Sequence, residues 1–139
     1  MVGLVVATHG RLAEELLQTA EGIVGRLERC EAVSIGASLS MEDCRRRLGE
    51  AIHRVDAGEG VLVLTDMFGG TPANLALTFL DDRIEVVTGV NLPMILKLAT
   101  ARAENLTLPA CAELVTAHGQ KNISLASELL RSRARTSRS

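Results

Sequence analysis

The sequence predicts a single α/β domain, in which a doubly wound, mainly parallel four-stranded sheet carries helices on both faces. Short apolar runs alternate along the chain with segments of helical spacing, which is typical of repeated β-α-β units. The run at 61–65 is apolar in all but its last residue, as expected of a central strand covered on both faces. The 139 residues suit one domain, and with 47% hydrophobic but only 1% aromatic residues the core must be aliphatic.

The first half of the chain contains two predicted strand-helix units. Val2–Ala7 is the first strand, and a helix with apolar residues at helical spacing runs from Leu12 to near Gly25. Glu31–Ile35 is the second strand. Ser40 is expected to cap the next helix, because an acidic residue follows it at the third helical position.

The next two units have the same order. Val61–Thr65 is the third strand, and Thr71 is expected to cap a helix that begins with proline at position 72 and runs to about Leu80. Ile84–Thr88 is the fourth strand, and Pro93 opens another helix. Because parallel strands joined by helices need crossovers of one hand, these units predict helices on both faces of the sheet.

The C-terminal region has a less regular pattern. Ala110–His118 can be helical, whereas Asn122–Ala126 alternates like a strand. We assign residues 1–130 to the domain and residues 131–139 to a polar, basic tail that is expected to be disordered, with anion binding as its alternative role.

Charge and cysteine content narrow the class of protein. The net charge of −2 includes four arginines after Leu130, so the domain itself is acidic, which argues against nucleic-acid binding. Cys30, Cys44 and Cys111 form no CxxC pair and follow no secretory signal, which predicts reduced thiols in the cytoplasm. Because no apolar stretch is long enough to span a bilayer, membrane contact is expected only through a partner.

Two ionisable side chains follow apolar strands. His9 comes after the first strand and Asp66 after the third, and ligands of open α/β sheets bind beyond the carboxyl ends of the strands. A carboxylate on one imidazole nitrogen fixes the tautomer and leaves the other nitrogen nucleophilic. A single histidine or aspartate at the end of a strand is commonly structural. Because His9 and Asp66 are expected at the same edge of the sheet, the two together are candidate catalytic residues.

The segment after Asp66 is suited to an anion. Gly69 and Gly70 let the backbone approach a ligand, and the helix that follows presents its positive end. Thr71 can use its hydroxyl either as the helix cap or as a donor to a phosphate. The other candidate pocket residues at this edge are Thr8, Gly10, Met67, Phe68, Asn74 and Asn91.

Several other chemistries lack their motifs. No Cys or His grouping has metal-ligand spacing, and the double glycine lacks the lysine of a P-loop. No nucleophile elbow with serine or cysteine is present. His53 lies in a helical pattern and His118 precedes a glycine, so both are expected to be structural or solvated. The site is therefore expected to need neither a metal nor a cofactor.

Three motifs resemble a known family. The stretches "VVATHG", "LTDMFGGTPANLA" and "VVTGVNLPMIL" are similar, in this order, to the mannose-family IIA domain of the bacterial phosphoenolpyruvate-dependent sugar phosphotransferase system, over roughly residues 2–130. The resemblance implies that His9 is phosphorylated by the histidine phosphocarrier protein and passes the group to a IIB component. It also implies that Asp66 is the partner of the ring and that Thr71 faces the phosphoryl group.

The resemblance carries further expectations. Members of the family pair as homodimers, some by exchanging a C-terminal strand, for which Asn122–Ala126 is the candidate. Many members continue into a IIB domain, so this chain, which stops at Ser139, is expected to act in trans. It would serve carbohydrate uptake or its regulation. The alternatives are a IIA-like phosphoryl donor to dihydroxyacetone kinase, and a phosphate-binding regulatory module in which His9 only donates a hydrogen bond.

Overall fold

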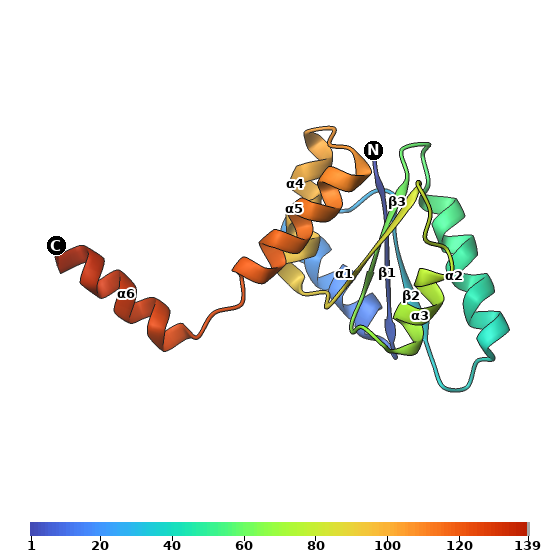
Figure 1. The fold of residues 1–139 in the computed structure, drawn as a ribbon, viewed down its shortest axis with the longest axis horizontal. Helices are drawn as coiled ribbons and strands as arrows, with labels where there is room; N and C mark the ends of the chain where they lie inside the picture. The colour runs from blue at the N-terminus through green and yellow to red at the C-terminus, as the bar shows by residue number, and fades with distance from the viewer. Residues whose placement is uncertain (139) are drawn as a thin grey trace.

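One parallel sheet forms the centre of the molecule. The computed structural model describes residues 1–138, with side chains through Arg135. Within these residues, four strands pair in the order β2-β1-β3-β4, all parallel (Figure 1). The strands are β1 (Gly3–His9), β2 (Cys30–Ile35), β3 (Val61–Thr65) and β4 (Ile84–Thr88). The predicted doubly wound α/β class is confirmed, and the bounds of β3 and β4 agree with the prediction to the residue.

Helices cover both faces of this sheet (Figure 1). On one face lie α1 (Leu12–Val24), α4 (Leu92–Ala103) and α5 (Leu108–Lys121), and on the other lie α2 (Met41–Val55) and α3 (Thr71–Leu77). Successive side chains of a strand point to opposite faces, so Leu4 and Val6 of β1 enter the first core and Val5 enters the second. This double burial explains why the central strands β1 and β3 are apolar without alternation.

The starts of α2 and α3 test two predicted caps. The Ser40 hydroxyl accepts the Asp43 N–H at 3.1 Å, which confirms the cap of α2. The prediction that Thr71 caps α3 is wrong, because Gly70 has the extended cap conformation and Thr71 is already the first helical residue. Helix α3 also ends before the predicted Leu80, because residues 78–80 continue it only as turns with i to i+3 hydrogen bonds.

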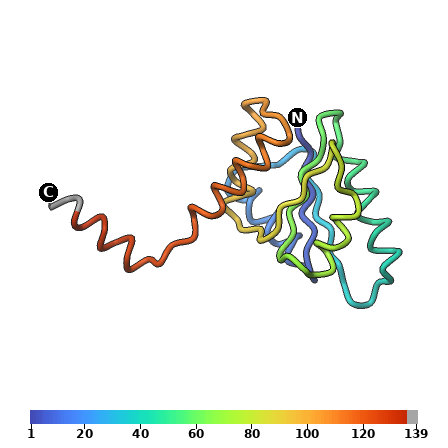
Figure 2. Tube along the Cα trace, viewed as in Figure 1, coloured from blue at the N-terminus to red at the C-terminus, as the bar shows by residue number. Residues whose placement is uncertain are grey.

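The C-terminal region differs most from expectation. The segment 122–125, predicted as part of a strand, is not a strand in this chain and leads into α6 (Ala126–Arg138). Residues 131–138, expected as a disordered tail, lie in helix α6; Ala, Leu and Arg are strong helix formers, and Arg131 donates to the Ser127 carbonyl one turn earlier. Ser139 lies outside the described residues. Figures 1 and 2 show α6 extending away from the rest of the molecule.

No helix in the described chain is long and apolar enough to cross a bilayer. Residues 1–138 likewise contain no group of three or more His, Cys, Asp or Glu side chains placed to hold a metal ion.

Candidate functional site

The candidate site lies where the order of the strands reverses. From β1 the chain passes through α1 to β2 on one side, while β3 pairs with the other side of β1. Such a switch point is where open α/β sheets bind ligands, because the loops on its two sides diverge. His9 is the last residue of β1, and Asp66 follows β3 directly. The sheet therefore brings the two candidate catalytic residues to one point.

The contact between these two side chains defines the chemistry of the ring. His9 Nδ1 lies 2.8 Å from Asp66 Oδ2, and the same oxygen accepts the backbone N–H of His9 at 3.2 Å. A carboxylate oxygen can only accept, so the hydrogen of the neutral imidazole is on Nδ1 and the lone pair is on Nε2. The His9 side chain is 48% exposed and that of Asp66 is 16% exposed. The free lone pair is therefore on Nε2, on a ring that solvent can reach.

Gly70 fits against the imidazole. A Cβ atom at this position would lie 2.6 Å from His9 Cε1 and 3.1 Å from Nε2, closer than side chains tolerate. The backbone of Gly70 is in a region open to every residue, so the requirement for glycine comes from the ring and not from the backbone conformation. The glycine is the reason that the loop after β3 can approach the nucleophilic nitrogen.

Two polar atoms beside the pair lack partners. Thr65 Oγ1 and Asp66 Oδ1 are buried, and neither has a hydrogen-bond partner among the described residues. A buried polar atom without a partner costs about 1–3 kcal/mol, and such atoms occur mainly where function requires them. Thr65 was not among the predicted site residues; it directly precedes Asp66, and its signal in the sequence was a hydroxyl residue at the end of an otherwise apolar strand.

Two of the predicted pocket residues hold helices in place. The Thr8 hydroxyl is buried, accepts the Ala13 N–H at 2.7 Å and donates to the His9 carbonyl. Asn91 caps α4 by accepting the Met94 N–H at 3.2 Å, and its amide nitrogen donates to the Gly119 carbonyl. Because their polar atoms are used in this way, Thr8 and Asn91 hold the loops at this edge of the sheet in place.

The remaining predicted residues lie on the loops around His9. Gly10 makes the turn into α1 with a positive φ of 55°, which favours glycine. Gly69 has a positive φ of 86° in the loop after β3, and Asn74 is exposed on α3. Thr71 lines a pocket with His9. The structure thus brings Thr71 next to the nucleophile.

The pocket beside His9 is largely apolar. It has a volume of about 260 Å³. Its other walls come from the end of β2, the loop 36–40 and the start of α2, which supply Ile35, Gly36, Ala37, Leu39, Met41 and Cys44. None of these six residues was among the predicted site residues. Three loops that meet near His9 also expose large apolar side chains, namely Leu12, Met41, Met67 and Phe68.

The fold and the site together define an α/β protein with a carboxylate-oriented histidine at the switch point of its sheet. Residues 3–116 match the family model EIIA-man, described as the PTS system fructose IIA component. The chain therefore belongs to the EIIA-man family and is a IIA component of the sugar phosphotransferase system, as the motif resemblance indicated. Components of this kind are phosphotransferases.

Individual relatives agree with this assignment. YadI from Escherichia coli strain K12, a candidate phosphotransferase enzyme IIA component, is 35% identical over 89% of this chain and 86% of its own length. The mannose-specific EIIAB component of the same strain is 30% identical over 88% of this chain but only 38% of its own length. The EIIA component from Streptococcus agalactiae has a similar structure, with a TM-score of 0.84 and 26% identity over 92% of this chain and 99% of its own.

Proposed function

We propose that His9 accepts a phosphoryl group from the histidine phosphocarrier protein and passes it to a IIB component that acts in trans, in the cytoplasm, for carbohydrate uptake or its regulation. The contact of His9 Nδ1 with Asp66 Oδ2 carries this proposal, because it leaves Nε2 free to attack phosphorus. In the first transfer, the bond from phosphorus to the donor's ring nitrogen breaks as the bond to Nε2 forms. In the second, the bond to Nε2 breaks and the acceptor takes the group.

The ring becomes positively charged when Nε2 binds phosphorus, since Nδ1 keeps its hydrogen. Asp66 is placed to stabilise that charge through the hydrogen bond to Nδ1. Phosphoryl transfer otherwise needs in-line positioning and donors for the equatorial oxygens. We assign these donor roles to the Thr71 hydroxyl and to the backbone N–H groups of Gly69 and Gly70. None of these steps calls for a bound cofactor.

Both partners have to reach the same nitrogen in turn. The exposed side chains of Leu12, Met41, Met67 and Phe68 offer apolar contact near His9, and Phe68 is 75% exposed. We propose that the phosphocarrier protein and the IIB component dock in turn on this surface. Their binding excludes water from the phosphohistidine, which limits loss of the group by hydrolysis.

One experiment tests the transfer directly. The chain is incubated with phosphoenolpyruvate, enzyme I and the histidine phosphocarrier protein, and its intact mass is measured. We expect an increase of one phosphoryl group that is lost in acid, and its transfer to a IIB component. A module that only binds phosphate would show no increase, and a donor to dihydroxyacetone kinase would pass the group to that enzyme and not to IIB.

Replacement of Gly70 tests the close approach of the loop to the ring. In Gly70→Ala, the added methyl group would contact the imidazole near Nε2 and displace either the ring or the loop. A displacement of about 1 Å can slow a positioned reaction by roughly 100-fold, so we expect a fall in phosphorylation rate of about that size. Gly22→Ala is the matched control, because a Cβ there meets no atom within 4 Å. Equal rates in the two variants would rule out the steric role.

We also propose that the chain forms a homodimer through its C-terminal segment. Strand β4 pairs only with β3 in the described structure, and the segment that leads into α6 exposes Ile123 and Leu125. Exchange of this segment between two chains would cover both the open edge and these side chains. We expect the double variant Ile123→Asp and Leu125→Asp to sediment as a monomer. Leu80→Asp, which changes another exposed leucine, should remain a dimer; a wild-type monomer at micromolar concentration contradicts the proposal.

A further inference from the structure

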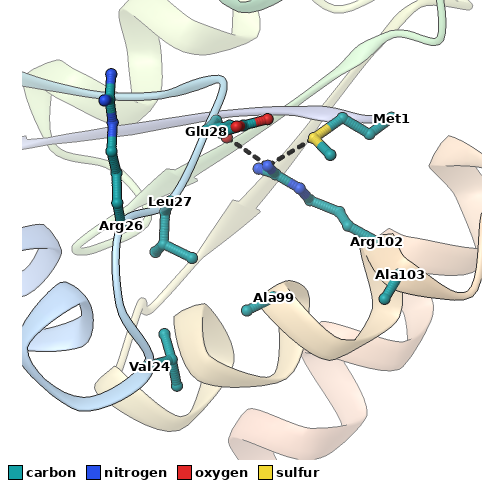
Figure 3. Close-up of a pocket in the computed structure, with 8 residues that line it drawn as sticks. All are labelled: Met1, Val24, Arg26, Leu27, Glu28, Ala99, Arg102 and Ala103. Atoms are coloured by element: carbon teal, nitrogen blue, oxygen red, sulfur yellow. Dashed lines mark hydrogen bonds between the residues drawn. The ribbon is translucent and has the colours of Figure 1, made fainter.

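An arginine is buried at the end of the sheet opposite His9. Arg102 lies in the last turn of α4, and only 7% of the residue is exposed. Its Nη2 donates to the Glu28 carbonyl and to Met1 Sδ (Figure 3). Its Nη1 donates to Cys30 Sγ at 3.0 Å. Two of these three acceptors are sulfur atoms, which accept hydrogen bonds weakly.

The charge of Arg102 lacks a counter-ion in the described structure. None of the described carboxylates lies within 4 Å of its guanidinium. Cys30 does not supply a negative charge, because burial raises the pKa of its thiol more than Arg102 lowers it. A buried charge is normally paired, since its removal from water is costly. The unpaired guanidinium therefore points to an anion from outside the chain.

A pocket of suitable size is next to this guanidinium. It has a volume of about 320 Å³, and Figure 3 shows Arg102 together with its other lining residues, which are Met1, Val24, Arg26, Leu27, Glu28, Ala99 and Ala103. The walls formed by Val24, Leu27, Ala99 and Ala103 are apolar. Arg26 is an exposed second cation at the edge, and it has no ion pair among the described side chains.

We propose that this pocket binds a small organic monocarboxylate, with the carboxylate on Arg102 and a short aliphatic chain against the apolar walls. Planar carboxylates match the fork of a guanidinium, and a pocket that combines apolar walls with a few placed polar or charged groups is the usual form of a small-ligand site. The seven residues of β1 separate the pocket from His9 by about 20 Å. The site is thus independent of the proposed phosphoryl transfer.

Butyrate is the probe, compared with chloride at equal ionic strength. At butyrate concentrations tenfold above Kd we expect the Tm to rise by about 4 °C. We also expect shifts of the backbone amide resonances of Leu27, Ala99 and Ala103. The proposal is overturned if butyrate does not raise the Tm above its value in chloride. It is also overturned if the resonance shifts are centred on His9.

Three variants locate the effect. Arg102→Met should abolish the butyrate-dependent rise, and Ala103→Leu should do so by filling the pocket from an exposed position without changing the arginine. His9→Ala should retain the rise, which separates this site from the phosphoryl site. Persistence of the rise in Ala103→Leu would overturn the proposal. The proposal would also be overturned if butyrate did not raise the Tm of the wild type and Glu28→Gln lowered it. Glu28 would then be the counter-ion of Arg102.

Discussion

His9→Ala is expected to abolish phosphoryl acceptance and to leave the fold intact. The variant removes the only atom that we assign to attack on phosphorus, so its rate should fall below detection, at least about 10³-fold lower than that of the wild type. Stability should change by no more than about 1 kcal/mol, because the half-exposed ring gives up a single side-chain hydrogen bond. The phosphorylation rate is measured as the gain in intact mass during incubation with phosphoenolpyruvate, enzyme I and the phosphocarrier. The free energy of unfolding is measured in urea.

The other two histidines are the controls for this prediction. His53 is exposed in the last turn of α2, and His118 lies in the last turn of α5. His53→Ala and His118→Ala should each still gain one phosphoryl group at the wild-type rate. Acid-labile phosphate on His9→Ala would show that another residue is the acceptor, and the proposed route through Nε2 would then be wrong.

The sheet could be predicted well because it is buried on both faces. Val61–Thr65 is a short run between polar turns that is buried along its whole length, which no helix of that length would be. Ile84–Thr88 is a half-buried edge strand that includes Glu85, and its β-branched residues mark it as a strand. Periodicity does not give the order of the strands, however. The meeting of His9 with Asp66 depends on β1 pairing with β3, which the sequence analysis could only assume.

The rest of the site could not be predicted because it depends on distant packing. Asn91 looked like a free polar group, but it holds Gly119, which is 28 residues further along the chain. The loop 36–40 has no charged residue that would mark it as part of a site, yet together with the end of β2 and the start of α2 it lines most of the pocket beside His9. Helix α6 was missed because a polar, basic composition favours disorder, whereas the helix propensity of the same residues favours a helix.

Asp66→Asn is expected to slow phosphorylation by roughly 100-fold while the protein remains folded. Asp66 Oδ2 accepts two N–H groups of His9, so the amide oxygen of asparagine should take its place and keep the hydrogen on Nδ1. The amide NH₂ group then takes the place of Oδ1, which is buried without a partner among the described residues. The variant keeps the tautomer and loses the negative charge, and it should be less stable by about 1–3 kcal/mol.

The rate of mass increase, measured beside Asp82→Asn as an exposed control, separates two roles of the carboxylate. If its charge stabilises the developing phosphohistidine, Asp66→Asn is slow and Asp66→Ala is slower still, because alanine also releases the ring from its orientation. If the carboxylate only orients the ring, Asp66→Asn should react at the wild-type rate and only Asp66→Ala should be slow. The second result would leave His9 as the acceptor but would remove the electrostatic role of Asp66, so the pair of variants decides which effect of the 2.8 Å contact matters for transfer.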